Sequence, residues 1–518
     1  MNLYSNFYSM DSEQQRKASA QRLFRYLRDY VEPYHPYLRR LYQEFGVKVD
    51  RLKSPDDIRR LPIIDKSHLQ SDPQSFILRP TVGNAQRAAN GFETEPLRTM
   101  TRLKYAAQAL ANYPPEYSQL VRQPTLQEKM RRRGLMEWQP IHTHISTGSS
   151  GHPTPVTYTY YDLNHVVPEV ASVFIRPQRG YPPAGADFDF NERTLNIFPG
   201  APHMAFFSPV LAKSAIGLST FETFGGAVIP TDRQLRLFVD GAFSCILAVP
   251  SYMLHWLRRA VALREEGKIG ALSTLKRIVL GAEPISEPLR EEMRRLAIAA
   301  GARPEVKILQ SFGMTEMRWS FLECAEGSGL HLNPKFFYWE LLHPETREPV
   351  APGEPGVLVF SHIGWRGTVL IRFWTGDLVK GGMRWERCPR CGYTFPRIFS
   401  PICRAEKDFT KLKGARIDLS VLVQVVRDTP GVRQFQIALE SEGSEEMFSR
   451  DVLTVEVCAQ PGQVHDDLKR QITARLKGYT EVSPDKIVFI EDEADLERRL
   501  FAKNQIKAEY IVERRSGG

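Results

Sequence analysis

Apolar residues in the first fifty positions recur with the spacing of an α-helix. One predicted helix face carries Leu23, Tyr26, Leu27, Tyr30 and Val31. Pro33 and Pro36 interrupt this period, which resumes from Tyr37 to Phe45. A further helix start is predicted at Ser54, because a proline follows it in the first-turn position. The N-terminal part is therefore predicted to be helical, with its aromatic side chains packed in a core.

From Thr194 onward the pattern alternates between short β-rich runs and helical segments. The predicted strands are Thr194–Phe198, Cys245–Val249, Arg277–Leu280 and Val306–Leu309, and the helical segments between them include Ser251–Arg264 and Glu287–Ala299. This alternation predicts an α/β fold with a parallel sheet, in which ligands bind at the carboxyl ends of the strands. Two loops, Gly281–Pro284 and Ser311–Glu316, are predicted at those ends.

The pattern changes again near Arg404–Gly414. Predicted strands at Gln434–Leu439, Val452–Val457 and Ile487–Ile490 accompany a helix at Asp466–Tyr479. We therefore predict an α/β protein with a large, multi-layer N-terminal domain over residues 1–403 and a small α+β domain over residues 404–518.

Composition is that of a water-soluble chain, with 42% hydrophobic and 25% charged residues among 518. The most apolar run, Val210–Pro230, is broken by Lys213 and Glu222, and the first ten residues lack the features of a signal peptide. We expect a cytoplasmic protein without a membrane partner. Six cysteines are too few for a disulfide scaffold in a chain of this length.

A formal net charge of +9 favours anionic partners, which include nucleotides, CoA and nucleic acids. The longest basic cluster, Lys129–Arg133, is short and has no aromatic residues between its charges. It is therefore interpreted as a solvated face, and no nucleic-acid partner is expected.

One stretch, HISTGSSGHPTPVTYT at His144–Thr159, places hydroxyl side chains between glycines. Its central residues are Ser146, Thr147, Gly148, Ser149, Ser150 and Gly151. Glycines allow backbone N–H groups to turn toward one anion, and the hydroxyl groups add further donors, so such a loop can bind phosphate. The alternative is an ordinary surface loop, and the GxxxxGK[ST] pattern of a Walker loop is absent.

Several sequence motifs, in their order along the chain, resemble those of the acyl-adenylate-forming superfamily, most closely its phenylacetate–CoA ligase branch. HISTGSSGHPT is similar to that branch's phosphate loop, normally HxSSGTTGKPT. The other matching segments are LKSPDDIRRLPIIDKSHL at Leu52–Leu69, GAEPISEPLR at Gly281–Arg290, SFGMTE at Ser311–Glu316, IRFWTGDL at Ile371–Leu378, a D-x-x-K-x-x-G run at Asp408–Gly414, and Lys507. Each motif is weak alone, but their joint order over about residues 35–513 is specific.

The resemblance implies that ATP and a carboxylic acid form an acyl-adenylate, from which a thiol such as CoA displaces AMP. Phe312 would stack on adenine, Thr315 would hold the α-phosphate, and Glu316 would bind Mg²⁺. Asp377 would accept the ribose hydroxyls, and Lys507 would neutralise charge as the adenylate forms. The implied nucleotide site also includes Gly281, Ala282, Glu283, Gly313 and Arg404.

Two departures from the family pattern stand out. His152 and Thr154 stand where relatives usually have a lysine near the phosphates, and Ile506–Lys507 replaces a Gly–Lys pair. In the superfamily the small domain is mobile and rotates about an Asp or Lys at the linker. Lys407 is the candidate hinge residue here, and an ordinary charged linker is the alternative.

The cysteine spacing indicates a metal site. CPRCG contributes Cys388 and Cys391, and Cys324-x6-His331 adds a distant pair. Three thiolates and one imidazole fit a closed tetrahedral Zn²⁺ site, which is structural rather than catalytic. The alternative is four reduced side chains packed locally. The remaining cysteines, Cys245, Cys403 and Cys458, are interpreted as buried or incidental thiols.

The resemblance places the acyl pocket between the phosphate loop and the strand after it. That region contains Phe198, His203, Phe206 and Phe207, together with Phe221–Gly226. Aromatic walls favour an aryl or arylacetic acid. His144 and His203 are candidates to contact its carboxylate, and buried, hydrogen-bonded core histidines are the alternative for both.

The sequence gives rise to three hypotheses about function. The favoured one is an AMP-forming ligase that converts an aromatic carboxylic acid, such as a benzoate, anthranilate or phenylacetate, into its CoA thioester. The altered phosphate loop motivates the second, an acyltransferase that loads an acyl carrier protein from aryl-CoA. The positive charge and the CxxC pair motivate the third, a zinc-dependent nucleic-acid-binding protein.

Overall fold

The computed structural model describes residues 7–80, 103, 134, 137–146, 154–173, 192–200, 204–405, 409–412, 415–442, 450–480, 482–502 and 508–514. Short helices form its N-terminal part, as the sequence predicted. They are η1 (Phe7–Ser9), α1 (Ser12–Tyr26), η2 (Leu27–Val31), α2 (Glu32–Tyr34), α3 (Pro36–Glu44), η3 (Val49–Arg51), η4 (Pro55–Arg60), α4 (Lys66–Ser71) and η5 (Pro73–Phe76). The break falls at His35, whose extended backbone is the conformation that a following proline imposes.

A six-stranded sheet in the order β4–β3–β5–β6–β7–β8 forms one half of the large unit. Its strands are β3 (Arg193–Asn196), β4 (Ser219–Glu222), β5 (Cys245–Ala248), β6 (Arg277–Leu280), β7 (Lys307–Met314) and β8 (Trp319–Leu322). Its helices are α9 (Met204–Ile216), α10 (Thr231–Asp240), α11 (Pro250–Glu265) and α12 (Glu287–Ala299). The first five strands of this order are parallel, so the predicted α/β fold is confirmed.

The prediction was wrong about the last part of this sheet. β7 does not end at Leu309 but continues through Ser311–Gly313 to Met314, and this stretch pairs antiparallel with β8. Ser311 and Gly313 look like turn residues in the sequence. Their backbone groups nevertheless find partners on β8, which the sequence did not reveal as a strand.

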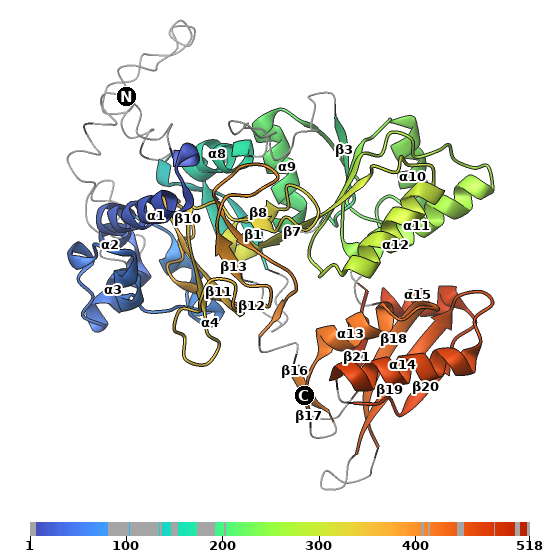
Figure 1. Cartoon of the computed structure of the whole chain (residues 1–518). Helices are drawn as coiled ribbons and strands as arrows, with labels where there is room; N and C mark the ends of the chain where they lie inside the picture. Colours follow the sequence, from blue (N-terminus) through green and yellow to red (C-terminus); the bar gives the residue numbers. More distant parts are fainter. Residues whose placement is uncertain are drawn as a thin grey trace, which may run out of the picture.

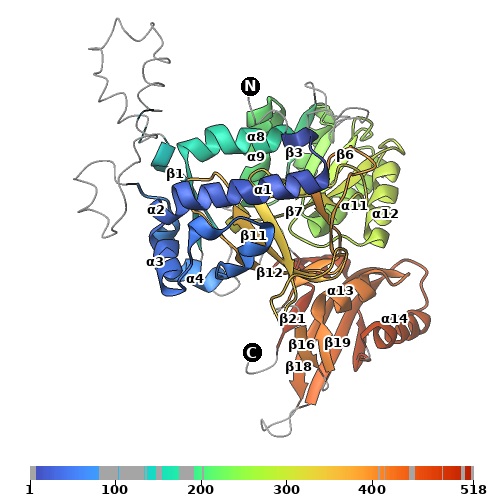
Figure 2. The same ribbon diagram turned by 60° about the vertical axis from the view of Figure 1, so that its left-hand side comes forward.

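A second body of antiparallel sheets packs under the N-terminal helices. β1 (Pro140–Ile145) and β2 (Pro155–Thr159) form a two-stranded sheet. A four-stranded sheet contains β10 (Phe337–Leu342), β11 (Gly356–His362), β12 (Phe373–Val379) and β15 (Ile402–Arg404). A three-stranded sheet contains β9 (Leu330–His331), β13 (Met383–Trp385) and β14 (Pro396–Ile398). Between them lie η7 (Asp162–Val166), α8 (Val167–Ser172) and η9 (Thr315–Met317). α1 runs in front of the strands of this body in Figure 2, and Ser19 Oγ on α1 donates to the carbonyl of Phe337 on β10. One apolar core joins these sheets to the N-terminal helices.

The C-terminal residues form a smaller α+β unit with its own apolar core, below α11 and α12 in Figure 1. Its elements are β16 (Phe409–Leu412), β17 (Ala415–Asp418), α13 (Leu419–Arg427), β18 (Val432–Glu442), β19 (Arg450–Ala459), α14 (His465–Thr480), β20 (Lys486–Phe489), α15 (Glu493–Leu500) and β21 (Ile511–Glu513). The sheet order is β20–β19–β18–β21. The fold class is thereby confirmed, whereas the boundary between residues 403 and 404 stays a prediction. Among the helices of the described ranges, none is long and apolar enough to cross a bilayer.

Candidate nucleotide-binding and metal sites

The predicted phosphate loop is closed at its base by the β1–β2 hairpin. The Ser146 N–H donates to the Thr154 carbonyl at 3.0 Å, and the Thr154 N–H donates to Ser146 Oγ at 3.2 Å. These bonds fix the two ends of the loop side by side. The residues between them, Thr147, Gly148, Ser149, Ser150 and Gly151, lie outside the described ranges, and their role in phosphate binding stays a prediction.

A lysine that sequence reasoning did not single out connects this loop to the predicted metal carboxylate. Lys66, the first residue of α4, places its Nζ 3.1 Å from Ser146 Oγ and 3.1 Å from Glu316 Oε1. The Glu316 side chain is 3% exposed, whereas that of Lys66 is 39% exposed. A cation therefore faces the loop in which His152 replaces the usual lysine. The only signal in the sequence was the position of Lys66 within a family-like segment.

Glu316 is held by a turn that a buried ion pair braces. The turn Thr315–Met317 ends at Arg318, whose φ of 62° is left-handed. The Arg318 guanidinium donates to Asp162 Oδ2 at 3.0 Å, and both side chains are fully buried. The Tyr158 hydroxyl donates to the Arg318 carbonyl at 2.8 Å. This unusual backbone conformation persists because the surrounding contacts fix it, and it sets the direction of Glu316.

Asp377 and Arg404 face each other across neighbouring strands. They form a register pair between β12 and β15, and Arg404 Nε lies 3.2 Å from Asp377 Oδ1. Arg404 Nη1 also donates to the Thr375 carbonyl at 2.7 Å. The carboxylate predicted to bind ribose is therefore oriented by an arginine just before the linker. The hinge candidate, Lys407, lies outside the described residues.

The predicted Gly281–Pro284 turn does follow β6, and it approaches β7 closely. A Cβ on Gly281 would lie 2.4 Å from Ser311 Oγ, so a larger residue here would displace the Ser311 side chain. Ala282 has a left-handed φ of 72°. Glu283 accepts two hydrogen bonds, both at 2.9 Å, from the backbone N–H and the hydroxyl of Ser251 at the start of α11. The turn is therefore tied to α11.

The Gly281–Pro284 turn, the end of β7 and the Asp377–Arg404 pair meet around one cavity of about 820 Å³, whereas Lys66, Ser146 and Glu316 do not line it. Predicted site residues that line it are Ala282, Glu283, Phe312, Gly313, Asp377 and Arg404. The small unit contributes Arg427 on α13 and the run from Ala508 to Ile511. Lys507 itself lies outside the described residues, directly before this run. A cavity of this size accommodates a nucleotide.

The predicted acyl-pocket residues form an aromatic cluster. The rings of His144 and Phe207 lie 4.9 Å apart, and the Phe206 ring lies 5.0 Å from that of Phe224. The sequence analysis missed His142, whose ring lies 4.5 Å from His144 and whose pKa is lowered by burial. His144 is fully buried among these rings. His203 lies outside the described residues, so contact between either predicted histidine and a carboxylate stays a prediction.

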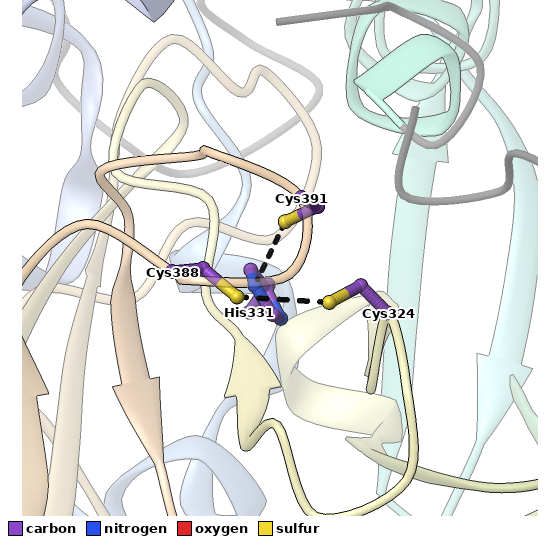
Figure 3. A group of neighbouring side chains, drawn as sticks. All are labelled: Cys324, His331, Cys388 and Cys391. Atoms are coloured by element: carbon purple, nitrogen blue, oxygen red, sulfur yellow. Dashed lines mark hydrogen bonds between the residues drawn. The ribbon is translucent and has the colours of Figure 1, made fainter. Parts of the chain in front are cut away.

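The four predicted metal ligands lie together (Figure 3). Ligand atoms of Cys324, His331, Cys388 and Cys391 all lie within 4.8 Å of one another. The sulfur atoms of Cys324 and Cys388 are 3.7 Å apart, and Cys391 Sγ is 3.3 Å from His331 Nε2. Three sulfurs and one imidazole nitrogen at this spacing are the donor set of a closed zinc site.

The surroundings of the cluster also fit a metal ion. His331 Nδ1 lies 3.0 Å from the Gly329 carbonyl, which fixes this nitrogen as a donor and leaves Nε2 toward the sulfurs. Burial lowers the pKa of His331, but the Cys324 and Cys388 sulfurs outweigh it and raise this pKa to about 9. Apolar side chains, among them Val173, Tyr393 and Phe395, cover the cluster.

A large α/β unit and a small α+β unit both line one cavity, which is the architecture expected of the class of AMP-forming ligases. No protein-family model matches the chain. Comparison with known sequences and structures nevertheless gives relatives of this class.

Curated relatives are phenylacetate–coenzyme A ligases. The protein of that name from Thermus thermophilus is 29% identical over 360 residues, which cover 64% of this chain and 73% of the relative. The Escherichia coli protein of the same name is 28% identical over 255 residues, which cover 47% of this chain and 51% of the relative. The chain thus spans about half of the latter protein. The resemblance to the phenylacetate–CoA ligase branch is confirmed.

Among solved structures, the fold matches 2-hydroxyisobutyryl-CoA ligase. The structure of its post-adenylation state gives a TM-score of 0.70 at 17% identity, covering 98% of this chain and 91% of the other. The structure of its thioesterification state gives a TM-score of 0.56 at 17% identity, covering 99% and 92%. At this identity the match establishes the fold.

Proposed function

We propose that this protein is an AMP-forming acid–thiol ligase that activates an aromatic carboxylic acid through its acyl-adenylate to a CoA thioester. The observation that carries the proposal is the convergence of Phe312, Asp377, the Gly281–Pro284 turn and the segment after Lys507 on one cavity. The names of the curated relatives support the same reaction.

The proposed roles follow from the chemistry of each side chain. Phe312 provides a flat surface for adenine, and Asp377 accepts the ribose hydroxyls while Arg404 orients it. Lys66, with Ser146 at the start of the loop, binds the phosphates. Thr315 donates to the α-phosphate, and Lys507 stabilises the negative charge that develops as the carboxylate attacks it.

We propose Glu316 as the carboxylate that binds Mg²⁺. Oxygen ligands and substrate phosphates are the usual partners of this ion. In the structure Glu316 is buried and paired with Lys66, whose long and partly exposed side chain can move toward the phosphates when a metal ion neutralises the carboxylate. Lys66 and Mg²⁺ would then share the charge of the triphosphate.

The aromatic cluster supports an aromatic acid as substrate. Phe206, Phe207 and Tyr158 offer apolar ring surfaces around His142 and His144. Which residues contact the carboxylate stays a prediction. We also propose Zn²⁺ at the cluster of three cysteines and His331, where a closed set of four ligands stabilises the fold and activates no water.

A pyrophosphate-exchange assay tests the proposal. The purified chain is incubated with Mg·ATP, labelled pyrophosphate and a panel of benzoates, anthranilate, phenylacetate and a long-chain fatty acid, and thioester formation is then followed with and without CoA. We expect exchange that depends on an aromatic acid, and thioester only when CoA is present.

Other outcomes of this assay are equally informative. If the chain transfers an aryl group from aryl-CoA to a carrier protein but shows no pyrophosphate exchange, the acyltransferase would replace the ligase as the proposed function. Exchange with the fatty acid alone would overturn the aromatic substrate class. A cytoplasmic location remains a prediction that fractionation of the source cells would test.

A further inference from the structure

The segment between two of the candidate metal ligands also forms part of the cavity wall. We call it the metal loop and define it as residues 324–331, which begin with Cys324 and end with His331. Figure 3 shows these two side chains in the cluster of four ligands. Gly327, Gly329 and Leu330, which lie between them, line the cavity. One short segment therefore belongs to both sites.

Hydrogen bonds within the metal loop connect its ligand residues to the residues between them. Ser328 Oγ accepts the N–H of Cys324 at 3.2 Å, and His331 Nδ1 lies 3.0 Å from the Gly329 carbonyl. Arg397 on β14 donates to the Ser328 carbonyl at 2.6 Å. A metal ion bound to Cys324 and His331 would fix both ends of the loop, and these bonds restrict the backbone in between.

Glu323, directly before Cys324 in the chain, joins the metal loop to β7. Its Oε1 accepts the N–H of Gly327 at 2.9 Å, and its Oε2 accepts the N–H of Gln310 at 2.8 Å. Arg290 on α12 lies 3.2 Å from the same Oε2, and both side chains are 5% exposed. One buried carboxylate therefore holds the metal loop, β7 and α12 together.

The strand that Glu323 holds carries the proposed adenine surface. Gln310 and Phe312 are two positions apart on β7, so their side chains lie on the same face of the strand, and both line the cavity. Ser400 Oγ donates to Gln310 Oε1 at 2.7 Å, and Ser400 also lines the cavity. A shift of the metal loop would therefore move Gln310 through Glu323, and the cavity wall with it.

We propose that the metal loop couples the metal cluster to nucleotide binding, so that loss of the metal ion loosens this wall of the cavity and lowers the affinity for nucleotide. This inference rests on the proposed function and on the proposed Zn²⁺ at the cluster. Glu323 is a positioning residue, because it acts through Gln310 and the backbone of β7. Coupling between two binding sites is reciprocal, so nucleotide must raise the affinity for zinc by the same factor.

The first experiment measures AMP binding by calorimetric titration of the zinc-loaded and the chelator-treated wild-type chain. AMP is the probe because it needs no added Mg²⁺, which could complicate the metal content. The temperature is chosen so that circular dichroism shows both forms folded. We expect the Kd for AMP to rise roughly tenfold without zinc, within the usual range of coupling between sites. Equal Kd values for the two forms would overturn the inference.

The reverse measurement does not require metal-free protein to be isolated. Zinc affinity is determined by competition with a chromogenic chelator, with and without saturating AMP. We expect AMP to raise the zinc affinity by the factor found in the first experiment. A merely structural role of the cluster, without contact to the nucleotide site, predicts no effect of AMP, and that result would overturn the inference.

A variant with all four metal ligands intact tests the connection itself. Glu323→Gln should still bind zinc, but the ratio of its AMP Kd values without and with zinc should fall toward one. Glu326→Gln is the matched control. Glu326 lies in the metal loop, accepts the N–H of Ile308 on β7 at 2.6 Å and pairs with Arg294 on α12, but it does not line the cavity. The control should keep the wild-type ratio. A wild-type ratio in Glu323→Gln, or equal losses in both variants, would refute the role of Glu323.

These measurements separate failure of the inference from failure of the proposed function. A zinc-loaded wild-type chain that binds neither AMP nor Mg·ATP would refute the proposed ligase. A chain that binds AMP equally well with and without zinc would refute only the coupling. A chain that takes up no zinc would likewise overturn the inference and leave the ligase proposal intact.

Discussion

Lys66 introduces a positive charge beside two oxygen atoms that the proposed reaction uses. Its Nζ is equidistant, at 3.1 Å, from Ser146 Oγ and Glu316 Oε1. The phosphate loop of this chain has His152 in place of a lysine, so its permanent charge is reduced. Because a buried carboxylate without a partner is unfavourable, Lys66 stabilises Glu316, which we propose as the Mg²⁺ ligand.

We expect Lys66→Ala to raise KM for ATP and to slow acid-dependent pyrophosphate exchange by roughly tenfold or more, because a charge-assisted contact to phosphate is lost. Lys66→Arg should keep most of the activity. Lys17, whose ion pair with Glu13 is exposed on α1, gives a matched lysine-to-alanine control. Steady-state kinetics over a range of ATP concentrations measure the effect. Equal KM values for Lys66→Ala and Lys17→Ala would remove Lys66 from the nucleotide site.

The residues of the candidate site differ in how well the sequence predicted them. Phe312 and Asp377 stand within recognisable motifs, and the cavity does contain them. Lys66 stands 80 positions from Ser146, in a segment whose spacing carries no chemical signal. His142 was missed because a histidine on a strand looks the same whether it faces solvent or an aromatic cluster. Contacts between residues that are far apart in the sequence form only on folding, so the local sequence pattern does not reveal them.

At the scale of elements, burial explains which strands could be predicted. β6 and α12 have the predicted bounds because three consecutive apolar residues after Arg277 and a Ser286 cap mark them clearly. β7 was predicted too short, since its last residues owe their strand conformation to pairing with β8. β9 has only two residues, Leu330 and His331, and no periodicity could reveal it.

The short strands around the four predicted metal ligands have little support from their own sheet. β9, β13 and β14 contain two or three residues each, and sheets of this size are marginal without other support. A metal ion bound by Cys324, His331, Cys388 and Cys391 would link β9 to the CPRCG turn. Such an ion would supply the cross-link that a small apolar core does not.

We expect the purified protein to contain about one Zn²⁺ per chain, and its removal by a strong chelator to lower Tm by roughly 5 °C or more. Elemental analysis and differential scanning calorimetry measure the two quantities. Cys391→Ser should reduce the zinc content, whereas Cys403→Ser, at a buried thiol away from the cluster, should keep it. Absence of metal together with equal melting of both variants would favour four reduced side chains packed without an ion.

At the scale of the whole molecule, the two units share one cavity but belong to separate cores. The large unit supplies Phe312, Asp377 and Glu283 to the lining of this cavity, while residues 508–511 of the small unit line it as well. A reaction in two steps can use such an arrangement, because moving one unit exchanges the catalytic groups without rebuilding the nucleotide site. The role of Lys507 should therefore be confined to one step.

Lys507→Ala should lower acid-dependent pyrophosphate exchange by roughly a hundredfold, since one charge that stabilises the transition state is lost. The same variant should convert preformed acyl-adenylate and CoA into thioester at the wild-type rate, because the acyl carbonyl is already activated by its bond to AMP, which leaves as the thiol attacks. Lys477, on the last turn of α14, provides a lysine-to-alanine control in the same unit. Single-turnover measurements of each step separate the two rates. Equal losses in both steps would mean that Lys507 stabilises the small unit rather than the reacting phosphate, and unchanged exchange would exclude it from the reaction.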